Sequence, residues 1–164
     1  MSSLAFRLKL AKQKGEQVAR EFGADRLLVD PFAIAAARDI LVQPNPDTED
    51  GVSGRLLRHN VNFGIVYATS IPSEGFQRFS VAHELGHYFL EGHIDHILPE
   101  NGAHASRAGF VSSDPYELEA DSFASGLLMP EKLFRQALGR HNPRLDAVIA
   151  AAELCGTSLT ATAI

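Results

Sequence analysis

The sequence is constrained most by one short segment, His-Glu-Leu-Gly-His at residues 83–87, which lies within an apolar stretch. The stretch 76–91 is predicted to be a helix, and Gly92 stands where glycine commonly ends helices. Apolar side chains surround that helix: Phe76, Phe79, Ala82 and Leu90 lie on or beside the histidine face, and Val81, Leu85 and Tyr88 lie opposite. A helix that is apolar all round is buried, so other elements must cover it. Gly86 costs such a helix about 1 kcal/mol relative to alanine, which predicts that another group approaches closely there.

The two histidines of this segment form a candidate metal site. His83 and His87 are four residues apart, so both imidazoles project from one face of a helix and reach a single metal ion. Zinc suits imidazole ligands, and catalytic zinc sites combine three protein ligands with a water molecule. Glu84 is adjacent and is placed to take a proton from that water as a general base. Burying these three polar side chains without partners would be unfavourable, which favours one Zn²⁺ per chain over a buried polar network.

The segment from Glu117 to Asp121 offers the first candidate for a third ligand. Asp114-Pro115 is predicted to begin a helix, which places Glu117 and Asp121 on one face of it. Glu117 would complete the zinc site, and Asp121 would accept the second N–H group of a ligand histidine. Because Glu117 stands three residues after Asp114, a capping box is an alternative role for it. Glu119 is expected to face solvent.

His93 is the second candidate for the third ligand. It follows His87 by six residues, the spacing at which metzincins place a third histidine, but those enzymes need a glycine where this chain has Leu90. The partial match therefore favours Glu117. Peptide cleavage also needs a donor for the oxyanion, and four side chains are candidates for that role: Tyr116, His93, His96 and His104.

The chain is predicted to form a single domain over residues 1–164, mostly helical with a few strands. Helices are expected at 4–22, 31–38, 76–91, 115–128, 130–139 and 143–154. Extended segments are expected at 40–42, 55–58 and 63–69, the last two pairing as a hairpin. A loop or an irregular edge is expected at 43–54, and a long loop at 92–113. Thr157-Ser158 is typical of the start of a further helix, which Ile164 cuts short as if the chain were trimmed from a longer one.

Charge and cysteine content exclude several classes of protein. The net charge of −5 argues against a phosphate-binding or nucleic-acid-binding protein, which usually carries a basic excess. Cys155 is the sole cysteine, so the chain has no internal disulfide and no Cys-x-x-Cys metal motif. No apolar segment reaches the length of a signal peptide or a membrane span. We therefore expect a cytoplasmic protein with neither a membrane nor a nucleic acid as its direct partner.

Two segments carry a resemblance to a known family: Arg78–Tyr88 and Glu117–Pro130. Both are similar to the ImmA/IrrE family of metallo-endopeptidases, and Asp30–Ala35 resembles the N-terminal helix of that family. The resemblance implies an α+β fold, namely a mostly helical zincin-like domain whose small mixed or antiparallel sheet packs on the helix of residues 83–87.

The same resemblance implies roles for individual residues and for the protein. His83, His87 and Glu117 would be zinc ligands and Glu84 the base, while Asp121 stands where the family often has asparagine and would serve the same supporting role. The implied activity is that of a zinc-dependent endopeptidase that cuts a helix-turn-helix repressor of the XRE type in a stress response or a mobile-element switch.

Two other classes of function remain open. One is a non-catalytic zinc module that binds a repressor or toxin partner without cutting it. An intact Glu84 argues against that class, because binding alone needs no base. The other is an antitoxin or DNA-binding regulator, which the acidic charge balance disfavours.

Overall fold

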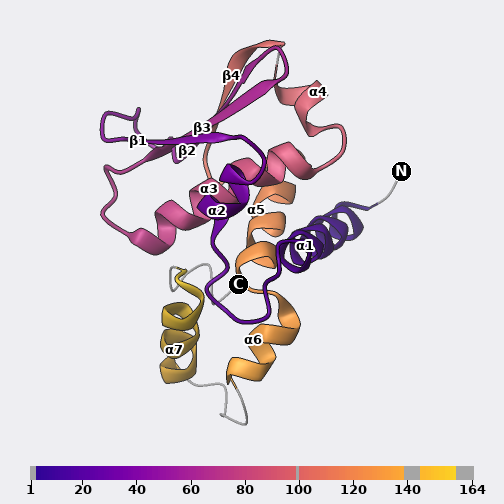
Figure 1. The fold of residues 1–164 in the computed structure, drawn as a ribbon, viewed down its shortest axis with the longest axis vertical. Coiled ribbons are helices and arrows are strands. Elements are labelled where there is room, and N and C mark those ends of the chain that lie inside the picture. The colour runs from indigo at the N-terminus through magenta and orange to yellow at the C-terminus, as the bar shows by residue number, and fades with distance from the viewer. Residues whose placement is uncertain (1–2, 99, 139–144, 158–164) are drawn as a thin grey trace.

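The computed structural model of the protein describes residues 3–98, 100–138 and 145–157, and it contains both helices and a small sheet (Figure 1). The helices are α1 (Leu4–Glu21), α2 (Pro31–Ala36), α3 (Glu74–Phe89), α4 (His93–Ile97), α5 (Pro115–Leu128), α6 (Glu131–Leu138) and α7 (Leu145–Cys155). The strands are β1 (Leu41–Asn45), β2 (Gly54–His59), β3 (Asn62–Ala68) and β4 (Asn101–Ser106). The predicted α+β class is confirmed.

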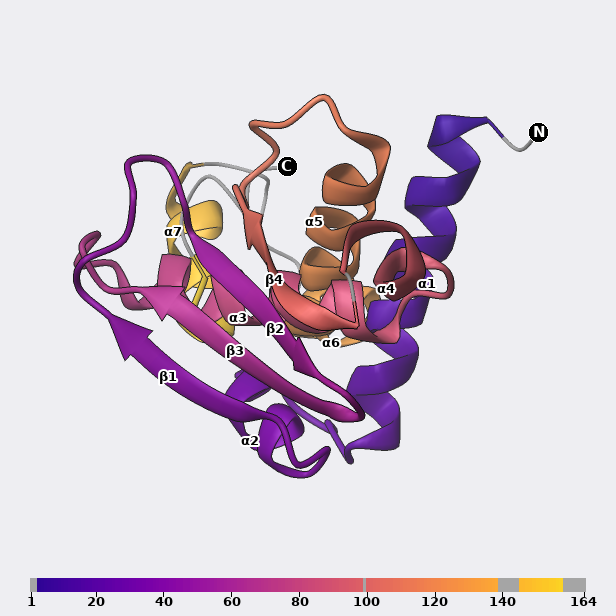
Figure 2. The same cartoon turned by 90° about the horizontal axis from the view of Figure 1, so that it is seen from above.

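The four strands form one mixed sheet in the order β1-β3-β2-β4. Strand β1 runs parallel to β3, whereas β2 is antiparallel to both β3 and β4. The predicted hairpin is confirmed: Leu56 of β2 pairs with Ile65 of β3, and Asn60 turns the chain with a φ of 56°. Both paired side chains are buried, and α3 packs against β2 and β3 (Figure 2). The sheet therefore covers one side of the helix that carries both histidines.

The expectation of a loop over residues 92–113 is wrong, because α4 and β4 lie within it. Helix α4 begins after Gly92, whose φ is 80°, and its first residue, His93, is buried. Strand β4 consists of Asn, Gly, Ala, His, Ala and Ser, which are poor strand formers. It is a strand because its backbone pairs with β2, with His104 opposite Leu56. Long-range pairing thus decides the local structure here.

The segment 43–54, expected as a loop or an irregular edge, contributes its first residues to a strand at the edge of the sheet and its last residue to β2. Strand β1 continues through Pro44 to Asn45, and β2 already begins at Gly54. Proline is tolerated in β1 because this strand lies at the edge of the sheet and pairs only with β3. Helix α3 is also shifted from its predicted bounds, since the Ser73 side chain accepts the N–H of Phe76 and caps the helix before Glu74.

Other predicted helices agree with the structure. Gly23, with a φ of 75°, follows the end of α1, and Asp30 accepts the N–H of Phe32 at 2.9 Å at the start of α2. Helices α6 and α7 correspond to the segments predicted at 130–139 and 143–154. Gly139, Pro143 and the helix expected after Thr157 lie outside the described residues. Within the described residues, no helix is long and apolar enough to cross a membrane.

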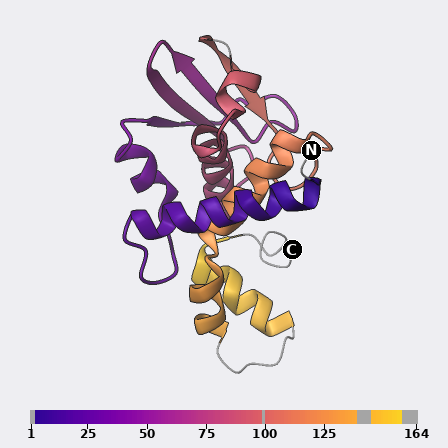
Figure 3. The same ribbon diagram turned by 90° about the vertical axis from the view of Figure 1, so that its right-hand side faces the viewer.

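Helix α5 lies between α3 and α1 and touches both through glycines. A Cβ atom built on Gly86 of α3 would lie 3.0 Å from Cα of Ala120, so the close approach predicted at Gly86 comes from α5. On the other side, a Cβ atom on Gly126 of α5 would lie 2.1 Å from the Lys12 carbonyl oxygen of α1. Figure 3 shows α1 running across α5. Backbone contact therefore fixes the three helices relative to one another.

Candidate metal centre

Helices α3 and α5 bring His83, His87 and Glu117 together at one point. The Nε2 atoms of His83 and His87 are 3.1 Å apart. Glu117 Oε2 lies 3.5 Å from the first of these nitrogens, and Oε1 lies 3.2 Å from the second. The three possible ligand atoms all lie within 4.8 Å of one another, and all three side chains are buried. Two imidazoles and one carboxylate are the ligand set of a known class of catalytic zinc sites.

The proton on His83 is fixed by Asp121. Nδ1 of His83 lies 2.8 Å from Asp121 Oδ1, and an ionised carboxylate can only accept, so this nitrogen carries the hydrogen. Nε2 then presents a lone pair toward His87 and Glu117. The Asp121 carboxylate is itself held by the backbone N–H groups of Gly109 and Phe110. Asp121 thus has the supporting position that its helical spacing indicates.

The proton on His87 is fixed by a longer chain of contacts. Its Nδ1 atom lies 3.0 Å from Nδ1 of His93, and Nε2 of His93 lies 2.9 Å from Glu119 Oε2. Glu119 accepts from Nε2 of His93, which leaves the Nδ1 lone pair of His93 to accept from Nδ1–H of His87. Burial lowers the pKa of His93, which keeps this ring neutral. Nε2 of His87 therefore also presents a lone pair to the centre.

These converging lone pairs require a positive charge between them. Burial lowers the pKa of His83, but the carboxylates of Asp121 and Glu117 outweigh burial and raise it to about 10. Burial lowers the pKa of His87 to about 3. Burial opposes the ionisation of Glu117, yet the hydrogen bond that it accepts from His104 and its contacts with His83 and His87 hold its pKa well below its usual range. Without a metal, His83 therefore carries a second proton, on Nε2. A divalent cation fits this site because it would replace that Nε2 proton, leave the Nδ1–H donating to Asp121 and satisfy all three ligands.

The carboxylate of Glu84 is buried, and neither oxygen makes a hydrogen bond of normal geometry to the described residues, although the Ser106 hydroxyl lies near enough to lower its pKa. Gly54 of β2 leaves the space for it, since a Cβ atom there would lie 2.7 Å from Glu84 Oε1. Burial raises the pKa of Glu84 to about 7, a value suited to exchanging protons near neutrality. Buried polar groups without partners are uncommon and often mark functional positions. The carboxylate can accept from a water or a substrate beside the metal centre.

The four oxyanion-donor candidates occupy two different places. His104 of β4 reaches Glu117, with 2.8 Å between Nε2 and Oε1, and its side chain is 23% exposed. The other three form a stack beyond His87: the rings of His96 and Tyr116 lie 4.0 Å apart, and Tyr116 also meets His93 edge-on. His93 contacts Nδ1 of His87, whereas Nε2 of His87 faces Glu117. This position does not suit His93 as a third metal ligand.

The expectation that Glu119 faces solvent is wrong. Its side chain is buried, where it contacts His93 and forms an ion pair with Arg7. The helical pattern of α5 cannot reveal the burial of Glu119, because the residues that bury it lie on α1, a distant part of the sequence. The capping-box alternative for Glu117 is not realised, since its carboxylate contacts the histidines and the N–H of Arg107.

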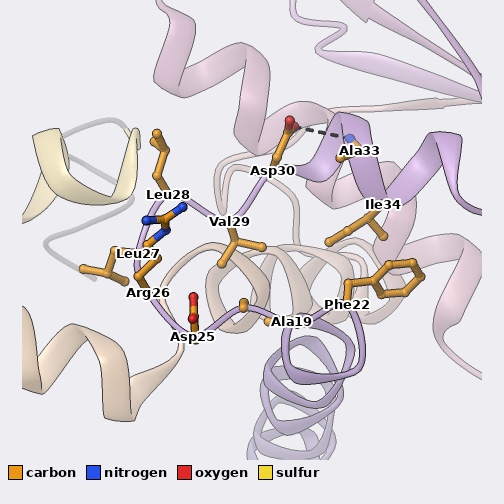
Figure 4. Close-up of a pocket in the computed structure, with 12 residues that line it drawn as sticks. Ala19, Phe22, Asp25, Arg26, Leu27, Leu28, Val29, Asp30, Ala33 and Ile34 are labelled. Atoms are coloured by element: carbon orange, nitrogen blue, oxygen red, sulfur yellow. Dashed lines mark hydrogen bonds between the residues drawn. The ribbon is translucent and has the colours of Figure 1, made fainter.

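A separate hollow of about 270 Å³ lies between the end of α1 and α2 (Figure 4). Its wall includes Phe22, Leu28 and Ile34 and two carboxylates, Asp25 and Asp30, of which Asp30 accepts from the backbone N–H groups that begin α2. None of the residues that line it belongs to the metal centre. The hollow therefore provides no ligand or proton acceptor for the chemistry of that centre.

Replacing Asp121 with alanine is expected to weaken zinc binding about 10–100-fold, because His83 loses the acceptor that orients it. Competition for zinc with a coloured chelator measures the change. Asp95→Ala, an exposed substitution on α4, is the control and should bind zinc as the unchanged protein does. Equal affinities for both variants would contradict a supporting role for Asp121.

Comparisons with known proteins agree with this geometry. The peptidase M78 family model, described as the IrrE N-terminal-like domain, matches residues 35–163. Metallopeptidase ImmA of Bacillus subtilis (strain 168) is 37% identical over 62 residues, which are 38% of this chain. The match spans 33% of the length of that relative. The resemblance seen in the sequence is confirmed, and the chain belongs to the peptidase M78 family of ImmA/IrrE-type metallopeptidases.

Proposed function

We propose that this protein is a zinc-dependent endopeptidase whose substrate is a helix-turn-helix repressor of the XRE type. The observation that carries the proposal is the buried carboxylate of Glu84, which makes no hydrogen bond of normal geometry to the described residues and accompanies the His83, His87 and Glu117 group. A metal site that only stabilises the fold has no use for such a carboxylate. Its pKa, raised by burial to about 7, matches the work of a general base and acid.

In this proposal His83, His87 and Glu117 would hold zinc, and the bound ion would supply Lewis-acid chemistry to the scissile carbonyl and to an attacking water. Glu84 accepts the proton of that water and passes it to the leaving amine. His104 is the proposed donor to the oxyanion, because its ring lies beside the centre and remains partly exposed. Its Nε2–H, which Glu117 accepts in this structure, would become available once Glu117 held the metal. Asp121 and His93 keep the two ligand histidines in the tautomer that leaves Nε2 free.

The repressor substrate is supported by the family rather than by the geometry of the site. The resemblance to the ImmA/IrrE family motivates both this substrate and a role in a stress response or mobile-element switch. The relative in Bacillus subtilis carries the name of a metallopeptidase. One zinc ion per chain and a location in the cytoplasm belong to the same proposal.

The test is to incubate the zinc-loaded protein with a panel of XRE-type repressors and to identify new N-termini by mass spectrometry. We expect one repressor to be cut at a defined bond, with loss of cutting after chelation and recovery after zinc is returned. A second incubation with a mixed peptide library reports general peptidase activity. Binding of a repressor with no cleavage of protein or peptide would favour the non-catalytic zinc module instead.

A further inference from the structure

We propose that Arg7 of α1 is a positioning residue for the metal centre and acts through Glu119 and His93 on the ligand His87. Arg7 Nε pairs with Glu119 Oε1, and the other oxygen of Glu119 lies 2.9 Å from Nε2 of His93. The Nδ1 atoms of His93 and His87 are 3.0 Å apart. The proposal rests on the proposed function only in requiring that His87 binds a metal.

The tautomer of His93 decides whether His87 can be a ligand. If His93 carried its hydrogen on Nδ1, it would donate to Nδ1 of His87, whose own hydrogen would then sit on Nε2. A protonated Nε2 has no lone pair for a metal. Glu119 prevents this state, because its carboxylate accepts only and so draws the hydrogen of His93 to Nε2.

Arg7 in turn holds Glu119 in place. Its guanidinium lies 5.3 Å from the ring centre of Tyr116 and pairs with the Glu119 oxygen that His93 does not use. His93 and Glu119 are 1% and 8% exposed, so water does not readily replace either partner. Removal of Arg7 would leave a buried carboxylate with one partner fewer, free to rotate away from His93.

The two ligand histidines are therefore supported from different parts of the chain. His83 depends on Asp121 and on the backbone of residues 109–110, all within the family match at 35–163. His87 depends on a residue of α1, which lies before that match begins. The glycine contact between α1 and α5 fixes the position from which Arg7 reaches Glu119. Helix α1 thus takes part in metal binding as well as in the core.

The first experiment measures zinc affinity of the full chain by chelator competition. We expect Arg7→Ala to bind zinc about 10-fold more weakly and Glu119→Gln about 10–100-fold more weakly, in the range for residues that support metal ligands. Arg20→Ala is the matched control: the same residue type on the same helix, exposed and outside the chain of contacts. Nitrogen-15 NMR of the zinc-loaded protein should show hydrogen on Nδ1 of His87.

The second experiment separates positioning from simple packing. The His93→Asn variant is designed so that the amide oxygen of asparagine replaces Nδ1 of His93 and accepts from Nδ1–H of His87. Asparagine has no group in the place of Nε2, so the contact with Glu119 is lost. We expect Arg7→Ala to have no further effect on zinc affinity in that background, whereas it weakens binding in the unchanged protein. An equal loss in both backgrounds would show that Arg7 acts by packing α1 and would overturn the proposal.

The failures of the two proposals can be told apart. A protein that cuts repressors or peptides, yet binds zinc equally well with and without Arg7, overturns the positioning role and leaves the peptidase intact. A protein that binds no zinc at all overturns both.

Discussion

Substitution of Glu84 by glutamine is expected to lower kcat for peptide cleavage about 10²–10⁴-fold, the usual contribution of a general acid–base group. Glutamine has nearly the same shape as glutamate, so it fits the space beside Gly54 without a new contact. It cannot accept a proton from water. Because the Glu84 carboxylate makes no hydrogen bond of normal geometry to the described residues, the main loss is its charge, which lies near His83, Ser106 and His104.

The measurement is cleavage of a fluorogenic peptide derived from the identified substrate, together with the zinc content of each variant. Glu91→Gln, an exposed change just after the same helix, is the control and should leave kcat unchanged. One zinc per chain with a large loss of kcat assigns Glu84 to the chemistry. A Glu84→Gln enzyme with normal kcat would contradict its role as base.

Zinc is expected to stabilise the fold strongly. At a free zinc concentration about a thousandfold above Kd, binding to the native state alone adds about 4.1 kcal/mol to the free energy of unfolding. For a chain of this length, that corresponds to an increase in Tm of about 8–16 °C. The physical reason is local: the lone pairs of His83 and His87 face each other at 3.1 Å, with the Glu117 carboxylate beside them.

Glu117→Ala should abolish most of this gain, because only two ligands remain and the charge that balances the cation is lost. Differential scanning fluorimetry with chelator and then with added zinc compares the two proteins. Glu91→Ala serves as the control for removing a surface carboxylate and should keep the full zinc-dependent rise. A rise in Tm that is the same in Glu117→Ala and in the unchanged protein would contradict Glu117 as a ligand.

The elements that sequence reasoning predicts well are those with a strong local pattern. The spacing of His83 and His87 defines both a helix and a shared face, and the structure has that helix buried over residues 78–87. Asp30 and Asp114 cap α2 and α5 through their own side chains, so these starts depend on neighbouring residues alone. Such features need no knowledge of the rest of the fold.

The elements that sequence reasoning misses depend on distant partners. Strand β4 has no strand-forming composition and exists because β2 offers an edge, so His104 reaches Glu117 through a pairing that its own segment does not encode. Glu119 looks exposed on a helical wheel, since the wheel does not include the helix that brings Arg7. The convergence of His83, His87 and Glu117 was therefore predictable, while most of the groups that orient these side chains were not.

The absence of a side chain at Gly54 bears on which members of this family can be active. The wall of the space around Glu84 is strand backbone, and a single methyl group at position 54 would fall within 2.7 Å of the Glu84 carboxylate. A related chain could keep His83, Glu84, His87 and Glu117 and still have lost catalysis through crowding alone. Active and inactive members of the family can thus differ at a residue that provides neither a candidate metal ligand nor the proposed base.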